Sequence, residues 1–177
     1  MPRIIMIDDE GDSHELAEYA EKLAEYGYSV GPTINASHPN WLPVSRIFMD
    51  TDHFLDYFEN MFIKGKEGEI NDVCAVVFDI QMPIGEKLKD KMSLMLGRYN
   101  YALSGYIIAD YLRHKYNESD MQMPCFVALT NTTQVQDDAI NYEGLFVEFM
   151  SKHPKIGERD PPFIRNCSII HKMISAQ

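Results

Sequence analysis

The sequence predicts a doubly wound α/β fold with a five-stranded parallel sheet. Apolar runs of strand length alternate with amphipathic stretches along the 177 residues, and such alternation is typical of parallel strands with helices on both faces. Two runs, residues 73–78 and 125–129, lack polar alternation, which indicates strands buried on both faces. Polar residues follow the runs, at the edge of the sheet where ligands bind. The length suits a single domain.

Residues 3–30 predict a strand, a helix and a second strand. Residues 3–7 form a short apolar run, and residues 15–26 carry apolar side chains at helical spacing. Gly27 is expected to end this helix in the left-handed conformation. Residues 28–30 then form the second strand.

A loop and a second helix precede the central strand. Residues 31–43 are rich in proline and asparagine, so we expect no regular structure there. Asp50 or Thr51 can cap the helix that follows, and residues 65–71 break it. One face of this helix is apolar and carries Phe54, Leu55, Phe58, Met61 and Phe62.

The second half of the chain contains the remaining strands. The strand at 73–78 is followed by residues 84–104, in which apolar side chains recur at helical spacing, and by a clear helix at 105–116. The later elements are a strand at 125–129, a helix at 134–142, a last strand at 145–150 and a helix at 163–174 that begins after two prolines.

Composition excludes several classes of function. A formal net charge of -11 disfavours direct binding to nucleic acid, whose phosphates attract basic surfaces. The sequence has neither the long apolar run of a membrane helix nor a secretory signal, so we expect a cytoplasmic protein. The three cysteines are widely spaced and predict buried thiols. The histidines show no metal-binding spacing.

Polar residues at the strand ends form the candidate site. They are Asp8 and Asp9 after the first strand, Asp79 after the third, Thr130 after the fourth and Lys152 after the fifth. Taken singly, an aspartate or threonine can cap a helix and a lysine can be a solvated surface charge. Together, three carboxylates repel one another unless a cation neutralises them. Their oxygen ligands predict a Mg²⁺ site.

These motifs resemble the receiver domain of two-component response regulators. Residues 4–10 (IIMIDDE) are similar to its acidic motif, residues 77–83 (VFDIQMP) to its phosphoacceptor motif, residues 126–130 to the strand that ends in a switch hydroxyl, and residues 149–152 (FMSK) to its last strand. The resemblance spans nearly the whole chain. It implies a flavodoxin-like fold, one receiver domain over residues 1–177 without an output domain, and insertions at 31–47 and 84–104.

The resemblance also implies a role for each site residue. Asp79 would be the phosphoacceptor, and Thr130 and Lys152 would contact the phosphoryl oxygens. The implied ligands of Mg²⁺ are Asp8, Asp9, Asp79 and the main-chain carbonyl of Gln81. Thr130 and Phe149 would form a switch, the alternative for Phe149 being an ordinary core aromatic.

The function implied is phosphorelay signal transduction. The phosphoryl group would come from the phosphohistidine of a histidine kinase or phosphotransfer protein, and the switch would control binding to a downstream protein partner. Such a domain catalyses its own aspartyl phosphorylation and dephosphorylation without being a conventional enzyme. A homodimer is compatible with the resemblance.

Three features depart from the family pattern. His153 separates Lys152 from Pro154, so the usual cis bond between lysine and proline is not expected. Asn131 follows Thr130 where a small residue is more usual, and its amide is expected either to narrow access to Asp79 or to hydrogen-bond the phosphoryl group. The insertion at 84–104 leaves the sheet beside Asp79 and is either a lid, a docking element or a static helix that extends the core.

Two other functions remain open at this point. A pseudo-receiver would use the same fold as a phosphorylation-independent protein-interaction module. A hydrolase of the haloacid dehalogenase type also uses an aspartate nucleophile and Mg²⁺, but it needs a second aspartate two residues later, where Gln81 stands.

Overall fold

A computed structural model describes residues 1–10, 14–31, 47–63, 72–92, 104–131 and 144–177. These ranges contain one sheet of five parallel strands, in the order β2-β1-β3-β4-β5. The strands are β1 (Arg3–Ile7), β2 (Ser29–Val30), β3 (Val73–Asp79), β4 (Cys125–Thr130) and β5 (Glu148–Ser151). The predicted five-stranded parallel sheet is therefore confirmed. Strand order reverses between β1 and β3, where a doubly wound sheet forms its ligand site.

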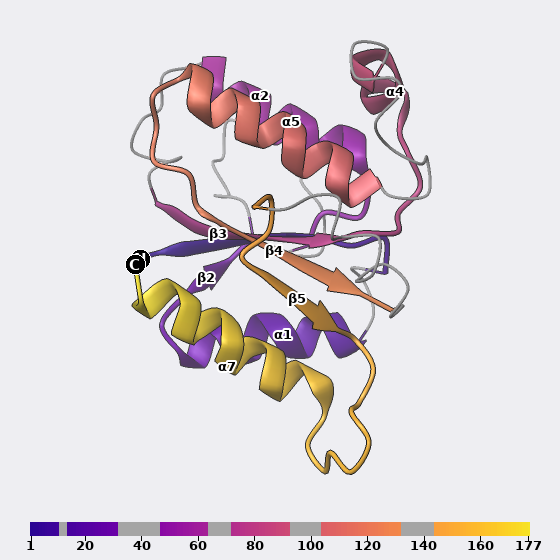
Figure 1. The fold of residues 1–177 in the computed structure, drawn as a ribbon, viewed down its shortest axis with the longest axis vertical. Helices are drawn as coiled ribbons and strands as arrows, with labels where there is room; N and C mark the ends of the chain where they lie inside the picture. Colours follow the sequence, from indigo (N-terminus) through magenta and orange to yellow (C-terminus); the bar gives the residue numbers. More distant parts are fainter. Residues whose placement is uncertain (11–13, 32–46, 64–71, 93–103, 132–143) are drawn as a thin grey trace.

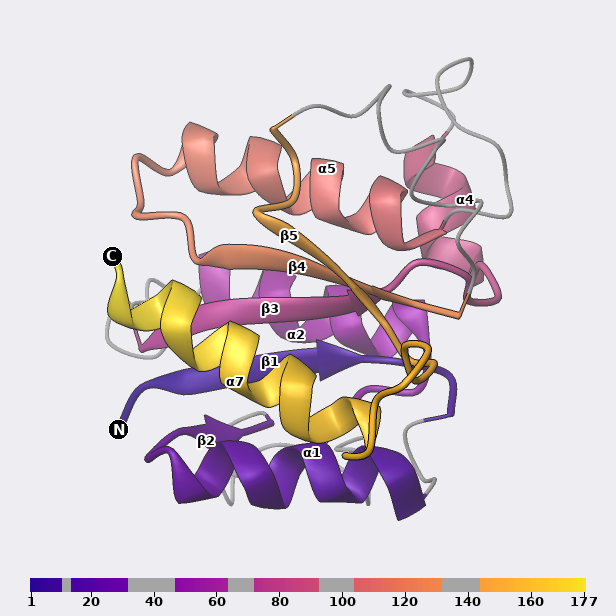
Figure 2. The ribbon, with the colours of Figure 1, turned by 60° about the horizontal axis from the view of Figure 1, so that its bottom comes forward.

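Helices cover both faces of the sheet (Figure 1). The described helices are α1 (His14–Glu25), α2 (Thr51–Ile63), α4 (Glu86–Met92), α5 (Ser104–Glu118) and α7 (Pro162–Ser175). The α1 and α7 helices lie side by side on one face, and α2 and α5 lie on the other (Figure 2). This arrangement confirms the doubly wound architecture.

Each face of the sheet has its own apolar core. In β3, Val76 and Phe78 belong to the core under α2 and α5, whereas Ala75 and Val77 belong to the core under α1 and α7. Successive side chains of a strand point to opposite faces, so a strand between two helical layers must be apolar throughout. Every residue of β1 and β4 is buried for the same reason.

The helix boundaries follow local signals. The Asp50 carboxylate accepts a hydrogen bond from the main-chain NH of His53 at 2.8 Å, which makes Asp50 the cap expected for α2. Gly27 has a φ of 89° after α1, as predicted. The three cysteines are free, with Cys125 and Cys167 buried and Cys74 half-buried.

The last strand begins later than predicted. Pairing with β4 starts at Glu148, whereas the sequence pattern indicates a strand from residue 145. Leu145 and Phe146 are consecutive, yet both are buried in the core beneath α5. Two neighbouring residues that face the same core break the alternation of a strand, so this apolar pair belongs to the connection before β5.

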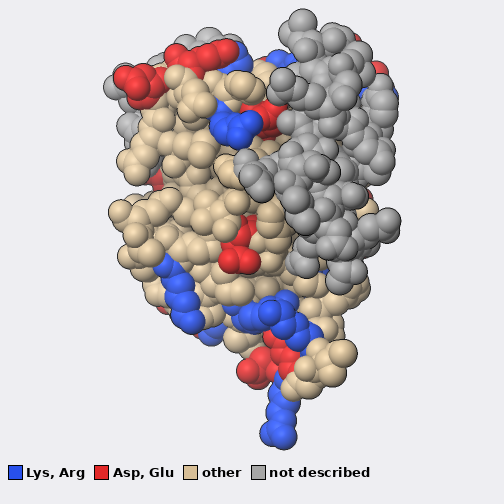
Figure 3. Space-filling model, in the orientation of Figure 1, with Lys and Arg blue, Asp and Glu red and all other residues tan. Residues whose placement is uncertain are grey.

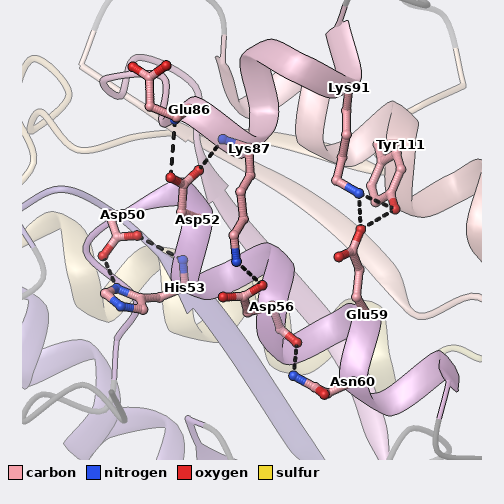
Figure 4. A network of polar contacts seen from close by, with 10 residues as sticks. All are labelled: Asp50, Asp52, His53, Asp56, Glu59, Asn60, Glu86, Lys87, Lys91 and Tyr111. Carbon is pink, nitrogen blue, oxygen red and sulfur yellow. Dashed lines mark hydrogen bonds and ion pairs between the residues drawn. The ribbon is translucent and has the colours of Figure 1, made fainter. Parts of the chain in front are cut away.

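The described part of the second insertion is anchored to α2 (Figure 4). Asp52 accepts hydrogen bonds from the main-chain NH groups of Glu86 and Lys87, both at 3.1 Å, and so caps the start of α4. Ion pairs join Lys87 to Asp56 and Lys91 to Glu59. Leu88 is fully buried in the core under α2 and α5. This part of the insertion extends the core as a helix.

Other expectations lie outside the described residues. These are the predicted helix at 134–142, the break at 65–71, nearly all of the insertion at 31–47, and residues 93–103 of the second insertion.

No described helix has both the length and the apolar character needed to cross a membrane. On the face shown in Figure 3, the described basic side chains lie apart from one another or beside acidic ones.

Candidate functional site

Three aspartates meet at the carboxyl ends of β1 and β3. Asp8 follows β1 directly and Asp79 is the last residue of β3, and the two strands are paired with Ile7 opposite Phe78. Carboxylate oxygens of Asp8, Asp9 and Asp79 lie within 4.8 Å of one another. Asp8 and Asp79 are buried, whereas Asp9 is exposed. The parallel pairing therefore produces a cluster with two buried carboxylates and one open to solvent.

The Lys152 side chain reaches both buried carboxylates. It follows β5, and its Nζ lies 2.6 Å from Asp8 Oδ2 and 3.0 Å from Asp79 Oδ2. The main-chain NH of Lys152 donates to the carbonyl of Thr130 at 3.0 Å, which continues the pairing of β4 and β5 beyond the strand end. Thr130 ends β4 and is itself buried. The structure thus brings together the aspartates, Thr130 and Lys152 predicted from the strand ends.

Each buried carboxylate is oriented by the turn that follows it. Asp8 Oδ1 accepts from the main-chain NH of Glu10 and Asp79 Oδ1 accepts from the main-chain NH of Gln81, both at 3.0 Å. Aspartate side chains commonly bond to main-chain groups two residues later in turns. The other oxygen of each carboxylate faces Lys152.

The electrostatics of the cluster favour neutralisation by a cation. Burial raises the pKa of Asp8 to about 6, with Lys152 opposing the shift and Asp79 adding to it. Burial also raises the pKa of Asp79. For Lys152, burial works to lower the pKa, but the Asp8 and Asp79 carboxylates outweigh it and raise the pKa above its ordinary value. One ammonium group therefore compensates three carboxylates only in part.

The donor set fits a divalent metal ion with a preference for oxygen. Asp8 Oδ2 is buried, and its partner among the described residues is the ammonium of Lys152 at 2.6 Å. Carboxylates, a main-chain carbonyl and water are ligands that Mg²⁺ accepts. The exposed carboxylate of Asp9 leaves one side of the cluster open to water or a substrate.

Comparison with known proteins gives the fold a name. No protein-family model and no curated protein matches the sequence. Solved structures match over the whole chain. A response regulator receiver domain from Clostridium thermocellum has a TM-score of 0.53 and 15% identity, and each chain is covered to 100%. The chain has the receiver-domain fold.

Other receiver structures match to a similar degree. A response regulator from Desulfuromonas acetoxidans has a TM-score of 0.52 and 13% identity, covering 99% of this chain and 98% of its own. A response regulator receiver domain from Rhodospirillum rubrum has a TM-score of 0.52 and 13% identity, covering 99% of this chain and 94% of its own. At this identity the match concerns the backbone, so the chemistry rests on the chain's own residues.

In this fold, the remaining predicted site residues are Gln81, Asn131 and Phe149. Gln81 stands in the turn after Asp79, and Asn131 is exposed directly after Thr130. Phe149 is half-buried, with its ring 5.4 Å from that of Phe146 and 6.3 Å from that of Tyr106. It therefore packs at the margin of the core beneath α5.

The start of α5 is a part of the candidate site that the sequence did not predict. Ser104 Oγ donates to the carbonyl of Met82 at 2.8 Å and accepts from its NH at 3.1 Å. The next residue, Gly105, lies so close to the end of β3 that a Cβ would stand 2.3 Å from the carbonyl oxygen of Asp79. These contacts hold the loop that contains Gln81. The signal available in the sequence was a Ser-Gly pair at the start of a strong helix.

The loop that contains Lys152 has His153, and not the lysine, directly before Pro154. The described ranges contain no cis peptide bond, and they include residues 152–154. The main-chain NH of His153 donates to Ser151 Oγ at 3.0 Å. Lys152 still reaches the carboxylates, so other contacts must hold its backbone in place.

Proposed function

We propose that the chain is a phosphoacceptor signalling module in which Asp79 accepts a phosphoryl group from a phosphohistidine donor with the help of Mg²⁺. One observation carries the proposal. The buried Asp79 carboxylate lies beside the Asp8 and Asp9 carboxylates at the end of the central strand, and Lys152 Nζ stands 3.0 Å from its Oδ2. A carboxylate with compensated charge can act as a nucleophile toward phosphorus.

The chain's own residues act mainly by position and charge. A carboxylate oxygen of Asp79 attacks phosphorus in line with the P–N bond of the donor, which breaks as its electron pair returns to the imidazole nitrogen. The turn after Asp79 holds the carboxylate through the NH of Gln81. Lys152 and the Thr130 hydroxyl contact the transferred oxygens. Asp8, Asp9, Asp79 and the Gln81 carbonyl would hold Mg²⁺, which supplies positive charge to the phosphoryl oxygens.

Loss of the phosphoryl group and signalling depend on residues around Asp79. Water hydrolyses the aspartyl phosphate, and the exposed Asn131 controls its access. Phosphorylation draws the Thr130 hydroxyl inward and lets Phe149 turn further into the core, which changes the surface offered to a downstream protein. The half-buried position of Phe149 against Phe146 and Tyr106 supports this role.

The proposed biological setting follows from this chemistry. The donor is a histidine kinase or a phosphotransfer protein, and residues 1–177 act as one receiver unit in a cytoplasmic phosphorelay. The output is binding to a protein partner or to a second copy of the chain. The acidic composition supports a protein output over a direct nucleic-acid one.

Measurement of the intact mass tests the proposal. The protein is incubated with a small phosphodonor and Mg²⁺, and we expect one added phosphoryl group that is lost in Asp79→Asn and in the presence of a chelator. Unmodified protein under all conditions would favour the phosphorylation-independent pseudo-receiver. Equal phosphorylation of Asp79→Asn would place the acceptor elsewhere.

A further inference from the structure

Two side chains from the first turns of α7 hold the backbone next to Lys152. The Ser151 carbonyl accepts hydrogen bonds from Arg165 Nη2 at 2.7 Å and from Asn166 Nδ2 at 3.0 Å. Arg165 Nη2 also lies 3.4 Å from the carbonyl of His153. These carbonyls stand on either side of Lys152, so the lysine backbone is held on both sides.

Further contacts brace Arg165. Its Nη1 forms an ion pair with Glu158, and its Nε donates to Asn166 Oδ1 at 3.0 Å. Glu158 in turn accepts from the main-chain NH of Lys155 at 2.7 Å. The Arg165 guanidinium therefore contacts the residues on both sides of Lys152 through Nη2 and contacts Glu158 through Nη1. A planar group with fixed donors loses little conformational freedom when it forms several hydrogen bonds.

Asn166 ties the same carbonyl to the other helix on this face. Its side chain is fully buried and donates to Tyr19 Oη at 2.7 Å. Tyr19 belongs to α1, which begins shortly after Asp8 and Asp9. The loop that contains Lys152 and the helix that follows the acidic motif are therefore connected through one buried amide.

We propose that Arg165 and Asn166 are positioning residues that place the Lys152 ammonium between Asp8 and Asp79. The inference rests on the proposed function for its consequence in phosphoryl transfer. Proline restricts the residue directly before it, and here that residue is His153, so Pro154 does not restrict the backbone of Lys152. The bonds to the Ser151 and His153 carbonyls supply the constraint. Neither positioning residue contacts the carboxylates; both act through Lys152.

The reactivity of the Lys152 amine tests the placement without any phosphoryl transfer. The protein is treated briefly with acetic anhydride, and labelling of Lys152 is measured by peptide mass relative to the exposed Lys172 of the same molecule. In the parent, the buried and doubly paired ammonium should react slowly. We expect Arg165→Gln to raise the relative labelling of Lys152 by about tenfold, because the released loop lets the amine reach solvent.

Matched variants separate positioning from general damage. Arg159→Gln removes an exposed arginine of the same loop and should leave the labelling of Lys152 unchanged. Glu158→Gln loosens Arg165 without removing it and should raise labelling by less than Arg165→Gln does. This second variant keeps the test valid if Arg165→Gln fails to fold. Equal labelling of Lys152 in the parent, in Arg165→Gln and in Glu158→Gln would overturn the inference.

A double-mutant cycle then measures the consequence for phosphorylation. With a small phosphodonor, Arg165→Gln should slow phosphorylation of Asp79 by about ten- to a hundredfold, the cost of a misplaced catalytic group. In a Lys152→Met background, Arg165→Gln should have no further effect, because its action passes through the lysine. Equal losses in both backgrounds would show a merely structural role and overturn the inference.

The two readouts distinguish failure of the inference from failure of the proposed function. A parent that is never phosphorylated, with Lys152 labelling that still depends on Arg165, would refute the function and keep the placement of Lys152. A parent that is phosphorylated normally, with labelling and rate insensitive to Arg165, would refute the placement and keep the function.

Discussion

Gly105 lies against the main chain of Asp79, and a Cβ at this glycine would stand 2.3 Å from the Asp79 carbonyl oxygen and 2.8 Å from the Cα of Ile80. The main-chain NH of Gly105 also donates to the Ile80 carbonyl at 3.2 Å. Helix α5 can therefore begin at this place only if its second residue has no side chain. The contact joins the start of α5 to the loop after Asp79.

Gly105→Ala should accordingly destabilise the protein and disturb the proposed metal site. Overpacking of this kind costs about 1–3 kcal/mol, because the obstructing atoms belong to the backbone and cannot rotate away. Urea unfolding measures the loss, and titration with Mg²⁺ should show weaker binding. Asn117→Ala, at an exposed position of the same helix, is the control and should change neither quantity. Normal stability in Gly105→Ala would mean that α5 is free to move away from the loop.

Asp79→Asn should stabilise the metal-free protein. Burial raises the pKa of Asp79, so ionisation of this side chain costs more in the folded state than in the unfolded one, and the amide removes that cost while preserving the size of the side chain. The expected result is a higher unfolding midpoint in urea with a chelator present, together with loss of phosphorylation. A midpoint below that of the parent would show that the ion pair with Lys152 outweighs the cost of burial.

Asp8 should make the stability of the metal-free protein depend on pH. Its pKa is about 6 in the folded state against an ordinary value of 3.8, so between these values the folded state binds a proton that the unfolded state does not. The free energy of unfolding should thus rise as pH falls through 6, by up to about 1.4 kcal/mol per pH unit.

Comparison with Asp8→Asn isolates this contribution. The variant lacks the titrating group, so the amount by which its free energy of unfolding exceeds that of the parent should be largest above pH 6 and should shrink as the pH falls. Urea unfolding of both proteins with a chelator, at several pH values, gives the difference. A difference that stays constant with pH would show that Asp8 does not titrate in this range.

Mg²⁺ should raise the melting temperature of the parent. The metal binds carboxylates that are assembled only in the folded chain, and saturation at a hundredfold excess over Kd contributes about 2.7 kcal/mol. For a chain of this size that corresponds to an increase of about 5–10 °C. Calorimetry with and without the metal measures the shift. The Asp8→Asn variant should lose most of it, and an equal shift in this variant would place the metal elsewhere.

Asp52→Ala should loosen α4 without affecting phosphorylation of Asp79. The substitution removes the carboxylate that accepts from the NH groups of Glu86 and Lys87, a loss that typically costs about 1 kcal/mol. Amide hydrogen exchange should become faster in α4 and remain unchanged in β3. Glu21→Ala, at an exposed position on α1, is the control. Unchanged exchange in α4 would mean that Leu88 and the lysine ion pairs suffice to hold the helix.

The sequence alone predicted the sheet and the central residues of the candidate site. Apolar runs without polar alternation identify strands buried on both faces, and parallel strands bring their carboxyl ends to one edge. Asp8, Asp79, Thr130 and Lys152 each end or follow such a run, so their convergence required no knowledge of side-chain contacts. The predicted start of the last strand was wrong, because the apolar residues Leu145 and Phe146 pack into the core and do not pair with β4.

Tertiary structure decided how these residues are held. Ser104 bonds to the main chain of Met82, Gly105 packs on the main chain of Asp79, and Arg165 donates to the carbonyl of Ser151. Each of these contacts joins a residue to the backbone of a distant segment. Every residue except proline presents the same NH and carbonyl groups, so residue type and spacing do not identify the main-chain partner of such a contact. Only the folded chain shows which main-chain group a side chain meets.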